Sequence, residues 1–89
     1  MQVVLTIVGR DKVGITARVA TALADMNINI ININQNIMQG FFNMVLIADM
    51  SASKVSLGEA RNRMSALGEE IGVEIRLQSE KIFAAMHRI

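Results

Sequence analysis

Few side chains of this 89-residue sequence are placed to do chemistry, and the best arranged lie between Gly9 and Gly14. Asp11 stands three residues before Gly14, and a helical pattern of apolar residues begins directly after the glycine. The unpaired N–H groups and the positive end of such a helix attract a carboxylate or another anion. A glycine here also suits a chain that only needs a sharp turn, so the spacing by itself supports an anion site and a plain turn about equally.

The residue types of an enzyme active site are not gathered anywhere in the sequence. His87, the sole histidine, is expected to be a solvated residue near the C-terminus, and Glu69 and Glu70 adjoin on a helix surface and point apart. The loop from Gly9 to Gly14 lacks the glycine and lysine pattern of a P-loop, and no aspartates show the spacing of a metal-binding loop. We therefore predict that the chain is not an enzyme and requires neither a cofactor nor a metal ion.

Composition argues against several other classes of function. The 9 Lys+Arg residues nearly balance the 8 Asp+Glu residues, and 3% of residues are aromatic, so the basic excess and stacking side chains typical of nucleic-acid binding are missing. No apolar run approaches the roughly 18 residues of a membrane helix, and the apolar start from Met1 to Val8 is too short for a signal peptide. The absence of cysteine fits a reducing cytoplasm. We predict a cytoplasmic protein that binds neither nucleic acid nor membranes.

Two strands and two helices are predicted from the spacing of apolar residues. Residues 2–8 are β-branched and apolar at both parities, which is typical of a central strand, and residues 73–78 alternate apolar with polar side chains. Residues 15–26 and 57–71 each carry one apolar stripe at helical spacing. The stripes are formed by Ile15, Val19, Leu23 and Met26, and by Leu57, Ala60, Met64, Leu67 and Ile71.

A β-hairpin is predicted between the two helices. Residues 27–38 alternate asparagine with isoleucine, and residues 41–50 form a second apolar strand after a tight turn at Gln39-Gly40. The alternation slips at Ile30-Ile31, where two apolar residues adjoin. A slip turns every later side chain to the other face, so it predicts a bulge or the true start of the strand.

The predicted elements follow the order β-α-β-β-α-β, which defines a ferredoxin-like α+β fold. Right-handed connections give a four-stranded antiparallel sheet in which the first and third strands are central and both helices cover one face. Residues 1–89 form a single domain, because this length leaves no room for a second one. A short C-terminal helix over residues 80–89 completes the prediction, with an apolar stripe of Ile82, Phe83, Met86 and Ile89.

The apolar residues exceed what two helices on one face can cover. The strands at 2–8 and 41–50 are apolar at both parities, so the second face of the sheet carries apolar side chains too. We predict a homodimer that buries this remainder. The apolar stripe of the C-terminal helix is expected to pack on a neighbouring chain or across its own sheet.

The loop and the following strand resemble the ACT domain, a small regulatory module that binds amino acids in many metabolic proteins. The resemblance rests on VGRDKVGI at residues 8–15 and MNINI at residues 26–30, where Asp11, Gly14 and Asn29 match the family's motif. The chain most resembles stand-alone ACT domain proteins of bacteria and archaea. It is also similar to the ACT domains of glycine-cleavage repressors and formyltetrahydrofolate deformylases.

The resemblance implies a ligand site at an interface between two domains. The loop and the start of the first helix would hold a ligand carboxylate, and Asn29 would meet the ligand's polar atoms. Val13 stands where many ligand-binding members carry proline, and Gly9 where serine-binding members carry histidine, so the resemblance does not extend to serine as the ligand. The predicted ligand-binding residues are Asp11, Lys12, Val13, Gly14, Ile15 and Asn29.

Two functions from different classes remain after these steps. We predict a non-enzymatic regulatory module that senses an amino acid or a similar metabolite at a dimer interface. The alternative is a ligand-free interaction module that docks on a metabolic enzyme or regulator through its sheet edge or its C-terminal helix. An acylphosphatase-like hydrolase would share the architecture, but no glycine-rich phosphate cradle accompanies Arg10.

Overall fold

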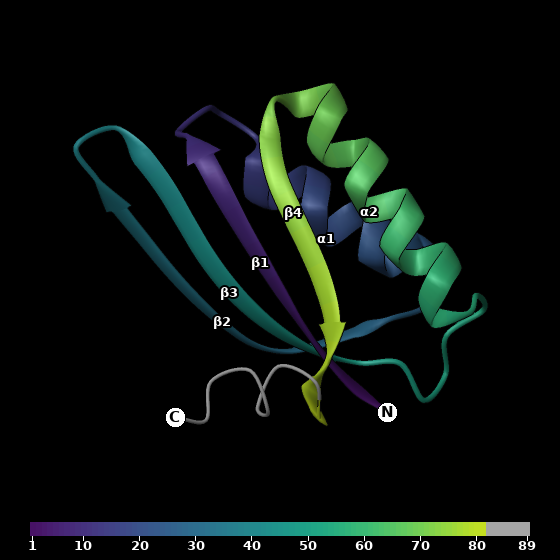
Figure 1. The fold of residues 1–89 in the computed structure, drawn as a ribbon. Coiled ribbons are helices and arrows are strands. Elements are labelled where there is room, and N and C mark those ends of the chain that lie inside the picture. The colour runs from purple at the N-terminus through teal and green to yellow at the C-terminus, as the bar shows by residue number, and fades with distance from the viewer. Residues whose placement is uncertain (82–89) are drawn as a thin grey trace.

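The structure, a computed structural model, describes residues 1–81 and contains the six predicted elements in the predicted order (Figure 1). The predicted C-terminal helix with Ile82, Phe83, Met86 and Ile89 lies outside the described residues. The strands and helices are β1 (Gln2–Arg10), α1 (Ile15–Asp25), β2 (Asn29–Met38), β3 (Phe41–Asp49), α2 (Leu57–Ile71) and β4 (Val73–Ser79).

The four strands form one antiparallel sheet in the order β2-β3-β1-β4, as predicted. The register of β2 on β3 shifts between Ile30 and Asn32, and β2 already begins at Asn29, so of the two predicted alternatives the structure has the bulge and not a later strand start. Gln39 and Gly40 have φ angles of 51° and 81°, so both central residues of the hairpin turn are left-handed. A two-residue turn of this kind matches the twist of the strands that it joins.

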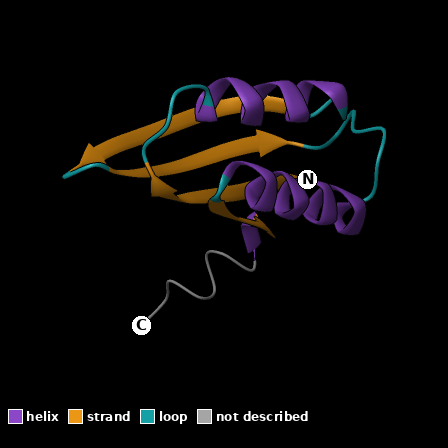
Figure 2. Ribbon diagram, turned by 90° about the horizontal axis from the view of Figure 1, so that it is seen from above, coloured by secondary structure: helices purple, strands orange, loops and turns teal. Residues whose placement is uncertain are grey.

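One hydrophobic core lies between the sheet and the two helices, which run side by side over it (Figure 2). It takes alternate residues from the strands, such as Leu5 and Met44, and the predicted stripes from the helices, such as Leu23 and Met64. Burial of these side chains supplies most of the stabilisation of a domain this small. The opposite face of the sheet, here called the open face, is covered by neither α1 nor α2.

Helix α2 is fixed at both ends and sits unusually close to the sheet. The hydroxyl of Ser56 accepts a hydrogen bond from the Glu59 N–H at 3.1 Å, and Gly72 ends the helix with a φ of 78°. A Cβ atom at Gly68 would lie 2.6 Å from the carbonyl oxygen of Val73. Only glycine at position 68 therefore allows α2 to approach β4 this closely.

Candidate functional site

The loop at residues 11–14 joins the end of β1 to the start of α1. The Asp11 N–H donates to the Gly40 carbonyl at 2.9 Å, which ties the loop to the β2–β3 turn. Gly14 is the N-cap of α1 with a φ of 91°, and no side chain caps the helix. A Cβ atom at Gly14 would meet nothing within 4 Å, so the space beside the amino end of α1 is open. The first N–H groups of α1 are thus not covered by a capping side chain.

The predicted site residues of this loop divide into outward and inward side chains. Asp11 and Val13 are exposed, Val13 completely. Ile15 is 3% exposed and belongs to the core, so only its backbone N–H faces the open end of the helix. The Lys12 ammonium donates to the carbonyl of Ile71 at 3.1 Å. Lys12 thus stabilises the carboxyl end of α2, where carbonyl groups lack helix partners.

Asn29 lies far from the loop within one chain. In the sheet, Asn29 of β2 pairs with Asp49 of β3, and Asp49 pairs with Gln2 at the start of β1. The loop instead follows Arg10, at the other end of β1. The eight residue steps from Gln2 to Arg10, at about 3.3 Å each, separate the two ends by roughly 26 Å. Asn29 instead lines a hollow of about 290 Å³ at the carboxyl end of α1. The predicted site residues therefore form two groups, not one.

Asp49, the strand partner of Asn29, is already engaged. Its Oδ1 atom accepts hydrogen bonds from the Ser51 hydroxyl at 2.6 Å and from the Ser51 N–H at 3.0 Å. These bonds, the side-chain bond first, hold the pKa of Asp49 below its ordinary value, because they favour the ionised carboxylate. The carboxylate orders the β3–α2 turn.

Gly9 is explained by packing. A Cβ atom at this position would lie 2.7 Å from Cγ1 of Val73 on β4. The histidine of serine-binding ACT domains cannot be accommodated here without moving β4. Sequence reasoning treated Gly9 as a departure in ligand recognition, and it missed the neighbouring strand that requires a glycine.

The amino end of α1 lies beside the edge strand β2. The Thr16 hydroxyl donates to Oε1 of Gln35 at 3.4 Å. Gln35 was not among the predicted site residues, although it lies in the amide-rich run of residues 32–36 that the sequence displays. An anion held at the start of α1 would thus face the edge of the sheet.

The two edges of the sheet differ in their protection. The edge strand β4 is covered by α2, and the Arg61 Nε donates to the carbonyl of Leu77 at 3.1 Å. Nine of the ten residues of β2 are exposed, and no charged residue occurs from Asn27 to Ala48. Long uncharged edges pair readily with another strand, whereas covered edges do not.

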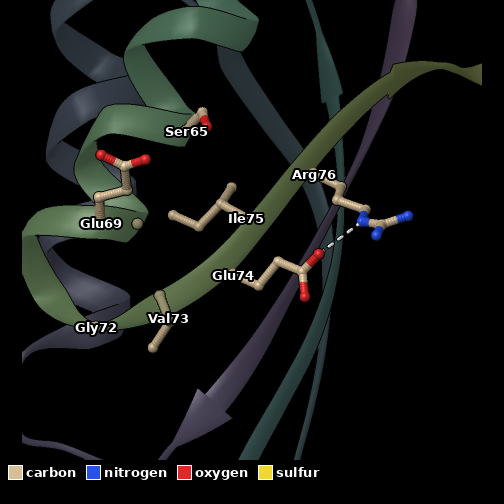
Figure 3. A pocket seen from close by; sticks show the side chains of 8 residues that line it. Ser65, Glu69, Gly72, Val73, Glu74, Ile75 and Arg76 are labelled. Atoms are coloured by element: carbon tan, nitrogen blue, oxygen red, sulfur yellow. Dashed lines mark hydrogen bonds and ion pairs between the residues drawn. The ribbon is translucent and has the colours of Figure 1, made fainter.

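A groove of about 550 Å³ lies between α2 and β4 (Figure 3). Ser65 and Glu69 on α2 and Ile75 on β4 face it, whereas Glu74 and Arg76 extend from β4 and form an ion pair at 2.9 Å. No acid and base converge on one point, so the groove does not resemble an active site.

The described part of the chain offers no metal centre and no membrane span. Within residues 1–81, no three carboxylate or imidazole side chains are grouped so that they could hold a metal ion. No helix over the same residues is long and apolar enough to cross a bilayer.

These features define a ferredoxin-like domain in which the amino end of α1 is uncapped and one edge strand of the sheet is exposed. The ACT domain model matches residues 1–78. Over all 89 residues the chain is 43% identical to a UPF0237 protein of Clostridium acetobutylicum, and the match covers both chains completely. The chain belongs to the ACT domain family, as the loop motif predicted.

Solved structures agree with this assignment. An ACT domain protein from Streptococcus pneumoniae superposes with a TM-score of 0.82 at 35% identity, over 93% of each chain. A formyltetrahydrofolate deformylase from Pseudomonas syringae superposes with a TM-score of 0.80 at 26% identity. The latter match covers 88% of this chain and 27% of the deformylase, so the similarity is confined to one part of that enzyme.

Proposed function

We propose that the chain is a non-enzymatic, cytoplasmic regulatory module that binds an amino acid or a similar small carboxylate between two copies of itself. ACT domains are regulatory ligand-binding modules, and the chain belongs to that family. The observation that carries the proposal is the distance between the two groups of site residues. Asn29 and the loop at residues 11–14 lie at opposite ends of one sheet, so one chain alone does not assemble the site.

A second copy joined along β2 would complete the site. An antiparallel pair of identical strands around a two-fold axis reverses the second strand, so its start lies near the end of the first. The partner's Asn29 would then lie toward Met38 of the first chain. The loop and the amino end of α1 are at this end of the sheet, as the Thr16–Gln35 hydrogen bond and the Asp11–Gly40 hydrogen bond show.

The chemistry of such a site suits a zwitterionic ligand. The free N–H groups at the start of α1 would receive the carboxylate, and the exposed Asp11 carboxylate would receive an ammonium group. Val13 would contact an apolar part of the ligand, and the partner's Asn29 would bond to its polar atoms. No residue of this set is positioned as an acid and base pair, so the chemistry is recognition without bond breaking.

Regulation requires that the ligand favour one state over another. A ligand that bound the free and the paired chains equally would shift nothing. Because the proposed site contains residues of two copies, ligand binding stabilises the pair selectively. A metabolic enzyme or regulator that recognises the paired form would then respond to the ligand.

The alternative is a ligand-free interaction module. The uncharged edge of β2 supports this alternative, because a strand of another protein can pair with such an edge.

Thermal unfolding separates the two functions. The native chain is unfolded with each of the twenty amino acids and with a panel of folates and nucleotides, all at millimolar concentration. A ligand at about 100 times its Kd adds about 2.7 kcal/mol to the free energy of unfolding. If no compound raises the Tm, the interaction module is the better account.

Two substitutions make that screen specific. Asn29→Ala is expected to abolish the shift and leave the dimer intact, because an exposed amide at a strand start contributes little to the fold. Asn43→Ala, an exposed amide on β3 outside the proposed site, is the matched control and should keep the shift. Equal loss in both variants would contradict the role given to Asn29.

The edge of β2 has its own test by light scattering at micromolar concentration. Asn34→Lys places two like charges near the two-fold axis and is expected to give the mass of a monomer. Gln78→Lys adds the same charge to the covered edge strand β4 and should leave the dimer mass unchanged. A native chain with a monomer mass would defeat the proposed pairing outright.

A further inference from the structure

The outer edge of β2 presents the backbone groups of alternate residues. A two-residue turn such as that at 39–40 closes on a hydrogen-bonded pair, here Met38 and Phe41. From this pair onward, hydrogen-bonded and non-hydrogen-bonded pairs alternate along the antiparallel ladder of β2 and β3. In the non-hydrogen-bonded pairs, the N–H and C=O groups of the β2 residue point away from β3. Three residues of β2 face the outer edge in this way: Ile33, Gln35 and Ile37.

The other edge of the sheet agrees with this alternation. The pairing places Ile33, Leu46, Leu5 and Leu77 in one row across the four strands. If the backbone groups of Ile33 point out of the sheet at β2, those of Leu77 must point out of it at β4. The Leu77 carbonyl does so, because it accepts a hydrogen bond from the Arg61 Nε on α2 at 3.1 Å.

The regular part of β2 is limited on both sides. The bulge at Ile31 interrupts it at one end, and the turn begins at Gln39 at the other. Gln35 lies midway, four residues from each. Ile33 and Ile37, two residues to either side of Gln35, pair with core residues on the helix side of the sheet, yet they are 40% and 50% exposed. The limits of the strand and its exposed apolar side chains are thus symmetric about Gln35.

We infer that two copies pair along β2 with their two-fold axis at Gln35, so that Gln35 lies opposite the partner's Gln35. This register rests on the β2 pairing of the proposed function and specifies it. Residues opposite each other in an antiparallel pair point to the same face, so the axis passes beside a residue that lies opposite itself. An axis at Gln35 lets all three outward residues bond to the partner strand. An axis at Asn34 or Asn36 lets two of them bond and sets the third against the bulge or the turn.

The same register covers the exposed isoleucines on the helix side. Ile33 lies opposite the partner's Ile37, and two such contacts flank the axis. Apolar side chains placed directly opposite each other stabilise a strand pair. Gln35 also accepts the hydrogen bond from the Thr16 hydroxyl, so the amino end of each α1 is linked to the axis.

The register also brings the parts of the ligand site together. The partner's Asn32 lies opposite Met38, so the partner's Asn29 falls beside the following β2–β3 turn. The Gly40 carbonyl of this turn accepts the Asp11 N–H at 2.9 Å. A register derived from backbone direction, the bulge and the turn therefore places the partner's Asn29 beside the loop at residues 11–14, although neither was used to derive it.

A charge at the axis gives one test of this register. Gln35→Glu sets two carboxylates opposite each other, and like charges so placed destabilise a strand pair. The Kd of the dimer is expected to rise about tenfold or more in sedimentation equilibrium. Gln78→Glu makes the same change on β4 and should leave the Kd unchanged. An unchanged Kd in Gln35→Glu would overturn the position of the axis.

Cross-linking of single-cysteine chains determines the register directly, since the natural chain has no cysteine. An axis at Gln35 places Asn34 opposite the partner's Asn36 on the open face, with Cα atoms about 4.5 Å apart, which a disulfide can span. Two copies of Asn34 lie diagonally at about 7–8 Å, which is too far. An equal mixture of Asn34→Cys and Asn36→Cys chains, one labelled with ¹⁵N, should form the mixed disulfide under mild oxidation. Either variant alone should stay reduced.

Other registers would give other products. Asn34→Cys chains linked to each other would place the axis at Asn34, and Asn36→Cys chains linked to each other would place it at Asn36. Either result overturns the register and leaves the β2 pairing of the proposed function in place. A dimeric chain without a link in any of the three samples overturns both. No sample contains a ligand, so the amino-acid screen stays a separate test of ligand binding.

Discussion

Replacement of Gly14 by alanine isolates the backbone geometry of the proposed ligand site. The φ of 91° at Gly14 lies in the left-handed region, where an L side chain costs about 1–2 kcal/mol. No atom lies within 4 Å of the added Cβ, so no packing energy offsets or enlarges this cost. The Tm is therefore expected to fall by about 5–15 °C, at roughly 4–8 °C per kcal/mol for a domain of this size.

Gly40→Ala is the matched control for Gly14→Ala. Gly40 has a φ of 81° and equally open surroundings, but it lies in the β2–β3 turn and not at the N-cap of α1. Both variants should lose similar stability in thermal unfolding at one fixed protein concentration. Gly14→Ala alone should also weaken binding of whichever amino acid shifts the native chain. A Tm unchanged in Gly14→Ala would refute the argument from strain.

Three further predictions concern the support of the site. Gly68→Ala should lower the free energy of unfolding by about 1–3 kcal/mol through its contact with β4, whereas Gly58→Ala, in open space on the same helix, should not lower it. Ser51→Ala should raise the pKa of Asp49, as measured by NMR titration, because the strongest hydrogen bond to its carboxylate is lost. The pKa of Asp49 in the folded chain lies below its ordinary value of 3.8, so the ionised carboxylate stabilises the fold above pH 3.8. This contribution is lost as the pH falls through the folded pKa. Lys12→Met should cost about 0.3–1 kcal/mol in chemical denaturation, since the last carbonyl of α2 loses its cation.

The elements of the fold were predictable because each is encoded locally. The apolar stripe of α1, the phase slip at Ile30-Ile31 and the turn at Gln39-Gly40 depend on residues a few positions apart. The spacing of apolar residues predicts helices and strands, and the residue types at a turn predict its conformation, without knowledge of distant contacts. The sheet order then followed from the handedness of the connections.

The arrangement of the site was less predictable because it depends on contacts between distant segments. Lys12 carries the charge of a ligand-binding residue, but its partner is Ile71, 59 positions away. Gly9 is required by Val73 on another strand, and Gln35 meets the start of α1 only after the sheet has formed. A family motif names Asn29 without showing that roughly 26 Å separates it from the loop of its own chain.

Mixing two inactive variants tests most directly whether two copies share one site. Asp11→Ala and Asn29→Ala should each abolish the amino-acid-dependent shift, and calorimetric titration of each pure variant should show no binding. In a mixed dimer, the intact loop of one chain meets the intact asparagine of the other, so one of the two sites is restored. A 1:1 mixture with random exchange should recover about one quarter of the native binding stoichiometry. No recovery in a mixture shown to contain mixed dimers would contradict the account, because each site would then belong to a single chain.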